Sequence, residues 1–284
     1  MEKRTFKRWN SKIVRLFWKQ VGGESPLEAV ERVCSELTDK LDKKTPPFQS
    51  EKYEFAELLN IRVVESKISC DGMLALAGTR FVIQVSESAT PERKSFTVCH
   101  ELGHAVMLRR ATQDFTKIKS FMRSQEQPRE EERLSNFFAA NLLMPRQSFF
   151  KKAINLKPST NSLFALASEY RTSVESTAHR IIELDAWKCH ILWCTIDQFE
   201  NKAVRILKFL KSDTLKCPFE RKGRVNWGMA SIDSACKGIA ANQRLVVHRP
   251  QGKAESELWR LEAAQHAFKS ESNVAIALIC PEAV

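Results

Sequence analysis

The stretch "FTVCHELGHAVM", residues Phe96–Met107, decides how the chain is interpreted, because it contains the pattern His-Glu-x-x-His. Residues four apart lie on one face of an α-helix, so His100 and His104 can direct two imidazole nitrogens at one ion. Glu101 is rotated by about 100° from His100, so it cannot join them as a ligand but can reach a water molecule beside the ion. The pattern therefore predicts two metal ligands and a general base.

The surrounding sequence, "SATPERKSFTVCHELGHAVMLRR", predicts a helix with Thr90 as its N-cap and Pro91 as its first residue. The helix is largely apolar, which indicates burial, and two buried histidines on one face need polar partners. The alternative, two surface histidines on an amphipathic helix, fits this composition poorly. Gly103 and Ala105 are small, so a second element can approach closely.

A catalytic zinc site needs a third protein ligand and an open position for water. The candidates are Glu130, Glu131 and Glu132, which begin the predicted helix "REEERLSNFFAANLL" before Pro145. Acidic residues are also favoured at a helix N-terminus by the macrodipole, which accounts for Glu130 and Glu131. Glu132 lies one turn before Asn136, on a face otherwise lined by Ala139, Ala140 and Leu143. The spacing favours Glu132 over Glu131 by a narrow margin, with Asn136 as a supporting residue.

These two motifs together resemble those of the ImmA/IrrE metallopeptidases, whose hallmark is "RFT-x-A-HELGH" followed by "E-x-x-x-N-x-FAA-x-LLMP". The resemblance extends upstream through "PPFQSEKYEFAELLNIRVVES" and "DGMLA…FVIQVSESATPERKSFT" and covers residues 46–185. Cys99 stands where alanine is usual, and Lys94-Ser95 replaces a Gln-Arg pair, but neither departure touches the ligand set. By position, the resemblance implies that His100, His104 and Glu132 bind zinc and that Glu101 is the catalytic base.

The resemblance also implies a function. Family members resemble gluzincin-type endopeptidases that typically cut one transcriptional repressor, often encoded beside them, and so release stress-response, phage or mobile-element genes. We therefore expect a zinc-dependent endopeptidase whose protein substrate is a helix-turn-helix repressor or an antitoxin-like partner. Manganese is conceivable with a carboxylate ligand. The alternatives are a DNA-binding regulator with a structural zinc ion and a toxin–antitoxin component that acts by sequestration.

The chain has 284 residues, which favours one or two domains. We predict an α+β fold, with a mostly helical zincin-like peptidase domain that contains a small β-sheet. The expected divisions are a basic helical extension over 1–45, the metallopeptidase core over 46–150, helix-turn-helix-like helices over 151–185 and an α+β domain over 186–284. Longer family members carry a GAF-like domain at the C-terminus, so a GAF-like sensor or docking domain is expected there.

Within these divisions, apolar periodicity predicts helices over 3–20, from Pro26 onward, over 51–61 and over 147–155. Residues 110–128 read as a long irregular loop. Strands are predicted in "IRVVESKI" and "MLALAGTRFVIQVS", and in the C-terminal segments "CHILWCTI", "KAVRILKFL", "RLVVHRP" and "NVAIALIC".

The net charge of +11 is concentrated in two segments, residues 1–20 and 201–225, each with a balance of +6. Such segments suit nucleic acid or an acidic partner, and they equally suit a solubilising surface. The segment "LFALASEYRTSVESTAHRIIEL" reads as helix–turn–helix. Its second helix offers only His179 and Arg180 as strong DNA contacts, which favours a packing module. His179 is also conceivable as an oxyanion-stabilising residue.

The eight cysteines are irregularly spaced, form no C-x-x-C pair and lie partly inside apolar runs, which indicates buried thiols in a reducing compartment. Cys189, His190 and Cys194 are better explained as strand residues than as a metal cluster. Neither a secretory signal nor a membrane-spanning run is evident, so a cytoplasmic protein without membrane contact is expected.

Overall fold

The computed structural model describes residues 9–41, 54–123, 129–196, 204–215, 224–225, 229–237, 240–247, 257–266 and 274–281. The chain forms two compact units. The first comprises Met1–Ser148 with Glu169–Ser173, and the second comprises Phe149–Ser168 with Val174–Val284. This division differs from the four predicted segments, because the N-terminal helices and the peptidase core share one unit.

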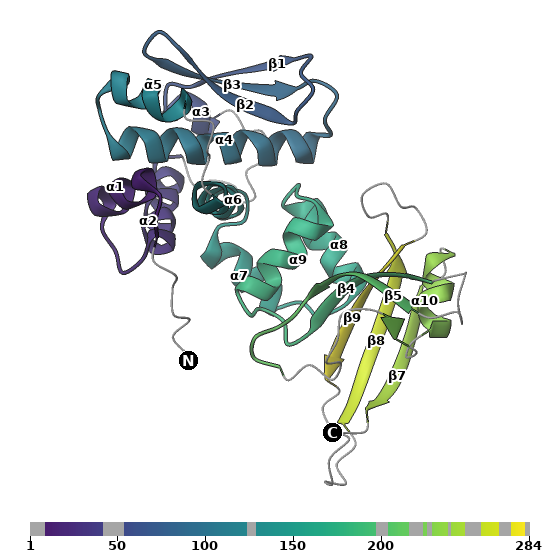
Figure 1. Cartoon of the computed structure of the whole chain (residues 1–284). Coiled ribbons are helices and arrows are strands. Elements are labelled where there is room, and N and C mark those ends of the chain that lie inside the picture. The colour runs from purple at the N-terminus through teal and green to yellow at the C-terminus, as the bar shows by residue number, and fades with distance from the viewer. Residues whose placement is uncertain are drawn as a thin grey trace. The chain divides into compact units, whose positions relative to one another are not determined.

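The first unit is mainly helical, with a small three-stranded sheet (Figure 1). Its helices are α1 (Lys12–Val21), α2 (Pro26–Lys40), α3 (Glu54–Leu58), α4 (Pro91–Ala111), α5 (Phe115–Arg123) and α6 (Arg129–Leu143). Its strands are β1 (Arg62–Ser66), β2 (Gly72–Ala77) and β3 (Arg80–Ser86). The strand order is β1-β3-β2, with β1 parallel and β2 antiparallel to β3.

Two helices, α2 and α4, begin at the N-cap residues that the sequence predicted. Thr90 accepts a hydrogen bond from the backbone N–H of Arg93, and Pro91 opens α4. Ser25 accepts from the Glu28 N–H in the same way at the start of α2. Because a capped N-terminus satisfies donors that have no partner within the helix, these boundaries are set by local sequence.

The N-terminal helix is shorter than predicted over its described part. Residues 1–8 lie outside the described residues, and α1 begins at Lys12 with Ser11 as its N-cap. Ile13 and Phe17 are buried in the core of the first unit, so this helix docks by its apolar face.

The predicted loop over 110–128 is wrong for residues 115–123, which form α5. Asp114 starts this helix, because its carboxylate accepts from the backbone N–H groups of Thr116 and Lys117 at 2.9 and 3.4 Å. Ile118 is only 1% exposed, so α5 is also held by apolar burial. The sequence did not predict this helix, because the segment is mostly polar and Ile118 is its one buried residue among those described.

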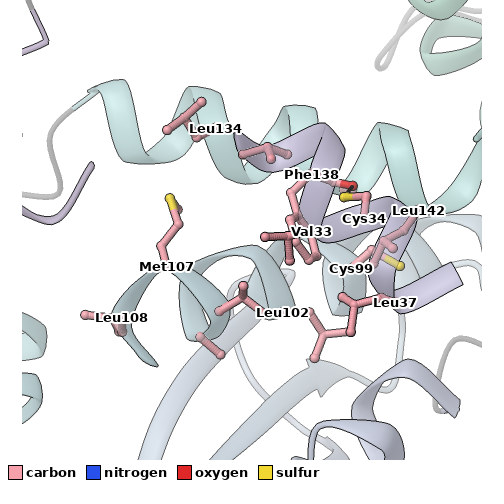
Figure 2. Packing of buried hydrophobic residues seen from close by; sticks show 14 of the residues in the cluster. Val33, Cys34, Leu37, Cys99, Leu102, Met107, Leu108, Leu134, Phe138 and Leu142 are labelled. Carbon is pink, nitrogen blue, oxygen red and sulfur yellow. Dashed lines mark hydrogen bonds between the residues drawn. The ribbon is translucent and has the colours of Figure 1, made fainter. Parts of the chain in front are cut away.

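The core of the first unit is formed where α2, α4 and α6 meet (Figure 2). Its side chains are apolar and almost fully buried, and they include Val33, Cys34, Leu37, Cys99, Leu102, Leu134, Phe138 and Leu142. The small sheet packs on another part of α4, where Gly72 of β2 meets Thr97. A Cβ at Gly72 would lie 2.2 Å from the Thr97 side chain, so glycine is required for this contact.

The second unit contains a six-stranded antiparallel sheet with helices packed on it. The strand order is β6-β5-β4-β9-β8-β7. The strands are β4 (His190–Ile196), β5 (Val204–Leu210), β6 (Arg224–Val225), β7 (Ala241–Val247), β8 (Glu257–Gln265) and β9 (Ala275–Pro281). The helices are α8 (Thr160–Glu169), α9 (Val174–Glu183) and α10 (Met229–Cys236), and α7 (Arg146–Ile154) runs from the first unit into the second. This sheet agrees with the predicted α+β class.

Strand β8 was not predicted, because Glu, Leu, Arg and Ala in "ELWRLEAAQ" are not typical strand residues. It pairs with β7 on one side and with β9 on the other, so sheet neighbours override the local preference. Cys189, His190 and Cys194 lie at and in β4, as predicted. The His190 Nδ1 atom accepts from the Ser212 N–H at 3.2 Å.

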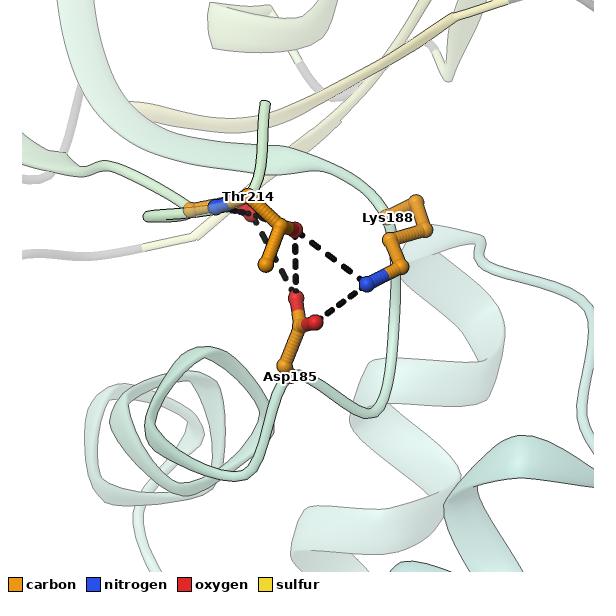
Figure 3. Close-up of polar contacts among 4 residues, drawn as sticks. Asp185, Lys188 and Thr214 are labelled. Atoms are coloured by element: carbon orange, nitrogen blue, oxygen red, sulfur yellow. Dashed lines mark hydrogen bonds and ion pairs between the residues drawn. The ribbon is translucent and has the colours of Figure 1, made fainter. Parts of the chain in front are cut away.

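A polar cluster fixes the connection between α9 and β4 (Figure 3). Asp185 has a positive φ of 51°, and its carboxylate accepts from the Thr214 hydroxyl at 2.8 Å and from Lys188. Lys188 also donates to Thr214 at 3.2 Å. The cluster therefore ties the start of β4 to the segment that follows β5.

In the described part of the chain, no helix is both long enough and apolar enough to cross a membrane.

Candidate metal centre

Two helices of the first unit bring the predicted ligands together. His100 and His104 lie one turn apart on α4, and their Nε2 atoms are 3.2 Å apart. The carboxylate of Glu132, in the first turn of α6, contacts both rings. Its Oε2 lies 3.3 Å from His100 Nε2, and its Oε1 lies 3.2 Å from His104 Nε2. His100, His104 and Glu132 thus form a group that could hold a metal ion.

The separations within this group fit a tetrahedral zinc ion. Zinc binds imidazole nitrogen and carboxylate oxygen at about 2.0–2.1 Å, so adjacent ligand atoms of a tetrahedral site lie about 3.3 Å apart. The nitrogen–nitrogen and nitrogen–oxygen distances of 3.2 to 3.3 Å match that spacing. Three protein ligands would leave one corner of the tetrahedron open, as in catalytic rather than structural zinc sites.

Asn136 orients the first histidine. Its Oδ1 lies 2.9 Å from His100 Nδ1. An amide oxygen only accepts hydrogen bonds, so Nδ1 carries the proton and Nε2 presents its lone pair towards the group. Burial lowers the pKa of His100, and the neighbouring His104 lowers it further. Both effects favour the neutral ring that a metal ligand must be.

The short distance between α4 and α6 depends on Gly103. A Cβ added there would lie 3.0 Å from the Ser135 Cα and 3.1 Å from the Phe138 Cβ. Glycine on α4 therefore allows the backbone of α6 to pass directly over the helix that carries both histidines. This close approach is the role that the sequence predicted for Gly103.

The other two acidic residues of the cluster have different partners. The Glu130 carboxylate accepts from the backbone N–H groups of Asn10 and Ser11, at 2.8 and 2.7 Å. Glu131 accepts from the Ser11 hydroxyl at 2.5 Å, and burial raises the pKa of Glu131. The contact with His104 lowers the pKa of Glu132, which favours the charged form. Among these three glutamates, Glu132 is the one whose carboxylate reaches both imidazoles.

Glu101 lies beside the group formed by His100, His104 and Glu132 rather than in it. Burial raises the pKa of its carboxyl, and the negative charge of Glu132 raises it further. The backbone N–H of Leu74, on β2, donates a hydrogen bond to this carboxylate. A carboxylate with a raised pKa, fixed in place by a backbone donor, suits a general base that works near neutral pH.

A pocket of about 340 Å³ opens over these residues, with walls from β2, α4, α5 and α6 and with Ile13 of α1. Within the part of the chain that the structure describes, β2 is an edge strand of its sheet. Since Leu74 directs its N–H at Glu101, the unpaired edge of β2 faces the pocket. Sequence reasoning missed the contributions of Ile13, Met73 and Leu74, because no local pattern shows which strand edge stays open.

The structure counts against one candidate nucleic-acid contact, for which the sequence already favoured a packing role, and leaves others untested. Arg180 of α9 is only 1% exposed and pairs with Glu183 at 3.0 Å, so it does not present its guanidinium to DNA. Glu175 of the same helix pairs with Lys208 of β5. Much of the basic segments 1–20 and 201–225 lies outside the described residues, so nucleic-acid contact there stays a prediction.

An His-Glu-x-x-His helix with a glutamate from a second helix beside it is an arrangement of zinc metallopeptidase domains. Comparison with known proteins agrees. Residues 56–181 match the family described as the IrrE N-terminal-like domain. That segment is therefore similar to the ImmA/IrrE family, as its motifs predicted.

Two similar proteins add detail. The radiation response metalloprotease IrrE of Deinococcus radiodurans is 31% identical over 105 residues, which are 36% of this chain. The match spans only 31% of that relative's length. A Mycobacterium tuberculosis transcriptional regulator of known structure superposes with a TM-score of 0.55 at 16% identity, covering 96% of this chain and 81% of that one. At this identity the likeness concerns the fold alone.

Proposed function

We propose that the protein is a zinc-dependent endopeptidase that cleaves a specific transcriptional repressor or antitoxin-like partner. The observation that carries the proposal is the juxtaposition of His100, His104 and Glu132 with the carboxylate of Glu101 in one pocket. A structural zinc site has no use for a general base or an open pocket. This pairing therefore favours an enzyme over a DNA-binding regulator whose metal is only structural.

The donor set favours zinc over manganese. Two imidazole nitrogens and one carboxylate at tetrahedral spacing suit zinc, whereas manganese favours oxygen-rich octahedral sites. When bound, zinc supplies Lewis-acid chemistry: it polarises a carbonyl group and makes water a stronger acid. Asn136 keeps the His100 ring oriented for this role.

The chain's own residues supply the remaining steps. The Glu101 carboxylate takes a proton from the attacking water and passes it to the amine of the cleaved peptide bond. The Leu74 N–H keeps that carboxylate at the pocket wall. An extended substrate segment adds to the open edge of β2, where backbone groups bind it independently of its side chains. Apolar side chains of the pocket, including Met73 and Met107, then select among substrates.

The substrate class rests on the family. The Deinococcus relative is named as a radiation response metalloprotease. The motifs of this chain resemble those of peptidases that act on one regulator. A repressor of the helix-turn-helix type, encoded beside this protein, is accordingly the first substrate to test.

The test incubates the purified full-length protein and zinc with the neighbouring repressor, and follows cleavage by gel electrophoresis and mass spectrometry. We expect defined fragments that a chelator prevents. Glu101→Gln should abolish cleavage while zinc stays bound. Glu92→Gln makes the same chemical change at an exposed position of α4 and should cleave normally.

Intact repressor after incubation with the zinc-loaded protein, across several candidate repressors, would overturn the proposed substrate class. Continued cleavage by Glu101→Gln would remove Glu101 as the base. Tight, salt-sensitive and sequence-selective binding to promoter DNA without any cleavage would instead identify a DNA-binding regulator.

A further inference from the structure

A pair of cysteines and an arginine lie side by side at one end of the six-stranded sheet, in the second unit. In the register of β4 with β9, His190 pairs with Ile279, and continuing that register by one residue places Cys189 opposite Cys280, with which it interacts. In the register of β8 with β9, Arg260 pairs directly with Cys280. Side chains of directly opposed residues point to the same face of a sheet, so the three groups form a row across it.

The contacts within this row stabilise one thiolate. The Cys189 thiol and the Arg260 guanidinium both donate hydrogen bonds to Cys280. The hydrogen bond from Cys189 lowers the pKa of Cys280, and the positive charge of Arg260 lowers it further. Burial alone has the opposite effect elsewhere in the chain, since it raises the pKa of Cys99 to about 12. Arg260 is itself held in position, because it donates to the Pro158 carbonyl at 2.8 Å.

A pocket gives small molecules access to this row. It has a volume of about 460 Å³ and is lined by Cys280, Arg260, Trp187 and two lysines, Lys157 and Lys188. Cys280 is 7% exposed, whereas Cys189 is completely buried. The thiol that can be reached is thus the one whose thiolate is stabilised, and the second thiol stands beside it. A reachable thiolate next to a second cysteine is the arrangement of redox-reactive cysteines.

We propose that Cys280 is a peroxide-reactive thiol and that Cys189 resolves its oxidised form into a cross-strand disulfide. In the first step, the Cys280 sulfur attacks one oxygen of hydrogen peroxide. The O–O bond breaks, a sulfenic acid forms, and the second oxygen leaves as water with the thiol proton. In the second step, the Cys189 sulfur attacks the Cys280 sulfur, the S–O bond breaks, and hydroxide leaves with the Cys189 proton as water. Two thiols lose two electrons, and one peroxide gains them.

The spacing of paired antiparallel strands is compatible with this bond. Directly opposed residues of antiparallel strands have Cα atoms about 4.5–5.5 Å apart. Disulfides span Cα separations of about 4.4–6.8 Å. Cys189 directly precedes the first paired residue of β4, so a disulfide to Cys280 is compatible with the spacing of these strands.

The chain contains a matched internal control on the other face of the same sheet. Cys194 and Cys236 lie close together, with 1% and 9% of their surfaces exposed. Their exposure resembles that of Cys189 and Cys280, but burial raises the pKa of both. If exposure alone decided reactivity, the two pairs would oxidise alike.

The test treats the reduced full-length protein with hydrogen peroxide and follows digested peptides by mass spectrometry. We expect a peptide linked through Cys189 and Cys280, reversed by dithiothreitol, at least about tenfold faster than a link between Cys194 and Cys236, because the pKa of Cys280 is lowered by its neighbours whereas burial raises the pKa of Cys194 and Cys236. Equal rates for the two pairs, or an unmodified Cys280, would overturn the proposal. This measurement uses the unaltered chain, so it does not depend on the folding of a variant or on peptidase activity.

Two variants separate the steps. Cys189→Ser should leave Cys280 as a sulfenic acid that dimedone traps. Cys280→Ser should leave Cys189 unreactive towards peroxide and dimedone. Dimedone labelling of Cys189 in the second variant would show that the roles are reversed and would refute the assignment of Cys280 as the attacking thiol.

Discussion

Replacing Gly103 by alanine tests whether close helix packing builds the metal centre. The added methyl group would lie 3.0 Å from the Ser135 Cα and 3.1 Å from the Phe138 Cβ. Ser135 presents backbone at this contact, which cannot turn aside as a flexible side chain can. The helix α6 must therefore move away from α4 by a few tenths of an ångström.

Two opposing effects set the change in stability. Overpacking a core contact costs about 1–3 kcal/mol. Alanine is a better helix former than glycine by about 1 kcal/mol in a helix interior. We therefore expect Gly103→Ala to lower the free energy of unfolding by about 0–2 kcal/mol, a modest change.

The effect on metal binding should be larger. Glu132 lies one turn before Ser135 on α6, so it moves with the helix. Metal sites keep ligand distances within about 0.2 Å of their preferred values, and the expected displacement exceeds that tolerance. We expect zinc affinity to fall by about tenfold or more, the range seen when groups that orient ligands are disturbed.

The assay measures zinc affinity by competition with a chromophoric chelator and unfolding by thermal denaturation with and without zinc. Ser135→Ala is the matched control, because it alters the residue at this contact without adding an atom between the two helices. The Ser135 hydroxyl is buried, with no hydrogen-bond partner among the described residues, so its loss should leave zinc affinity unchanged. If Gly103→Ala binds zinc as tightly as the unaltered chain, close approach at Gly103 does not position Glu132.

Three further outcomes are expected. Asn136→Ala should weaken zinc binding by about 10–100-fold with little change in stability, and equal affinity in a chelator competition would show that Asn136 does not orient His100. Ser11→Ala removes both the N-cap of α1 and the donor to Glu131, so it should lower the free energy of unfolding in urea by about 1–3 kcal/mol; an unchanged denaturation midpoint would argue against this. Zinc at 100 times its Kd should stabilise the metal-binding unit by about 2.7 kcal/mol, so a melting temperature that does not respond to zinc or chelator would contradict a folded metal site.

Local patterns predicted much of the first unit. Thr90 and Ser25 cap their helices, and α4 has an apolar periodicity. Both features depend on residues within a few positions of each other, so the sequence alone predicts them. The same patterns failed where neighbours in space decide the structure. The sequence of β8 does not favour a strand, but pairing with β7 and β9 makes it one. The helix α5 was missed because a single buried residue, Ile118, anchors it.

The sequence by itself determined that His100 and His104 share a helix face and that Glu101 lies to one side of it. The reason is that the helical period relates residues only four positions apart. Tertiary structure decided which glutamate completes the group, because that choice depends on how closely α6 passes Gly103 and on Ser11 engaging Glu131. It also decided that β2 opens its edge to the pocket and that Cys189, Arg260 and Cys280 meet. Strand order and register join residues far apart in the chain, and no local pattern encodes them.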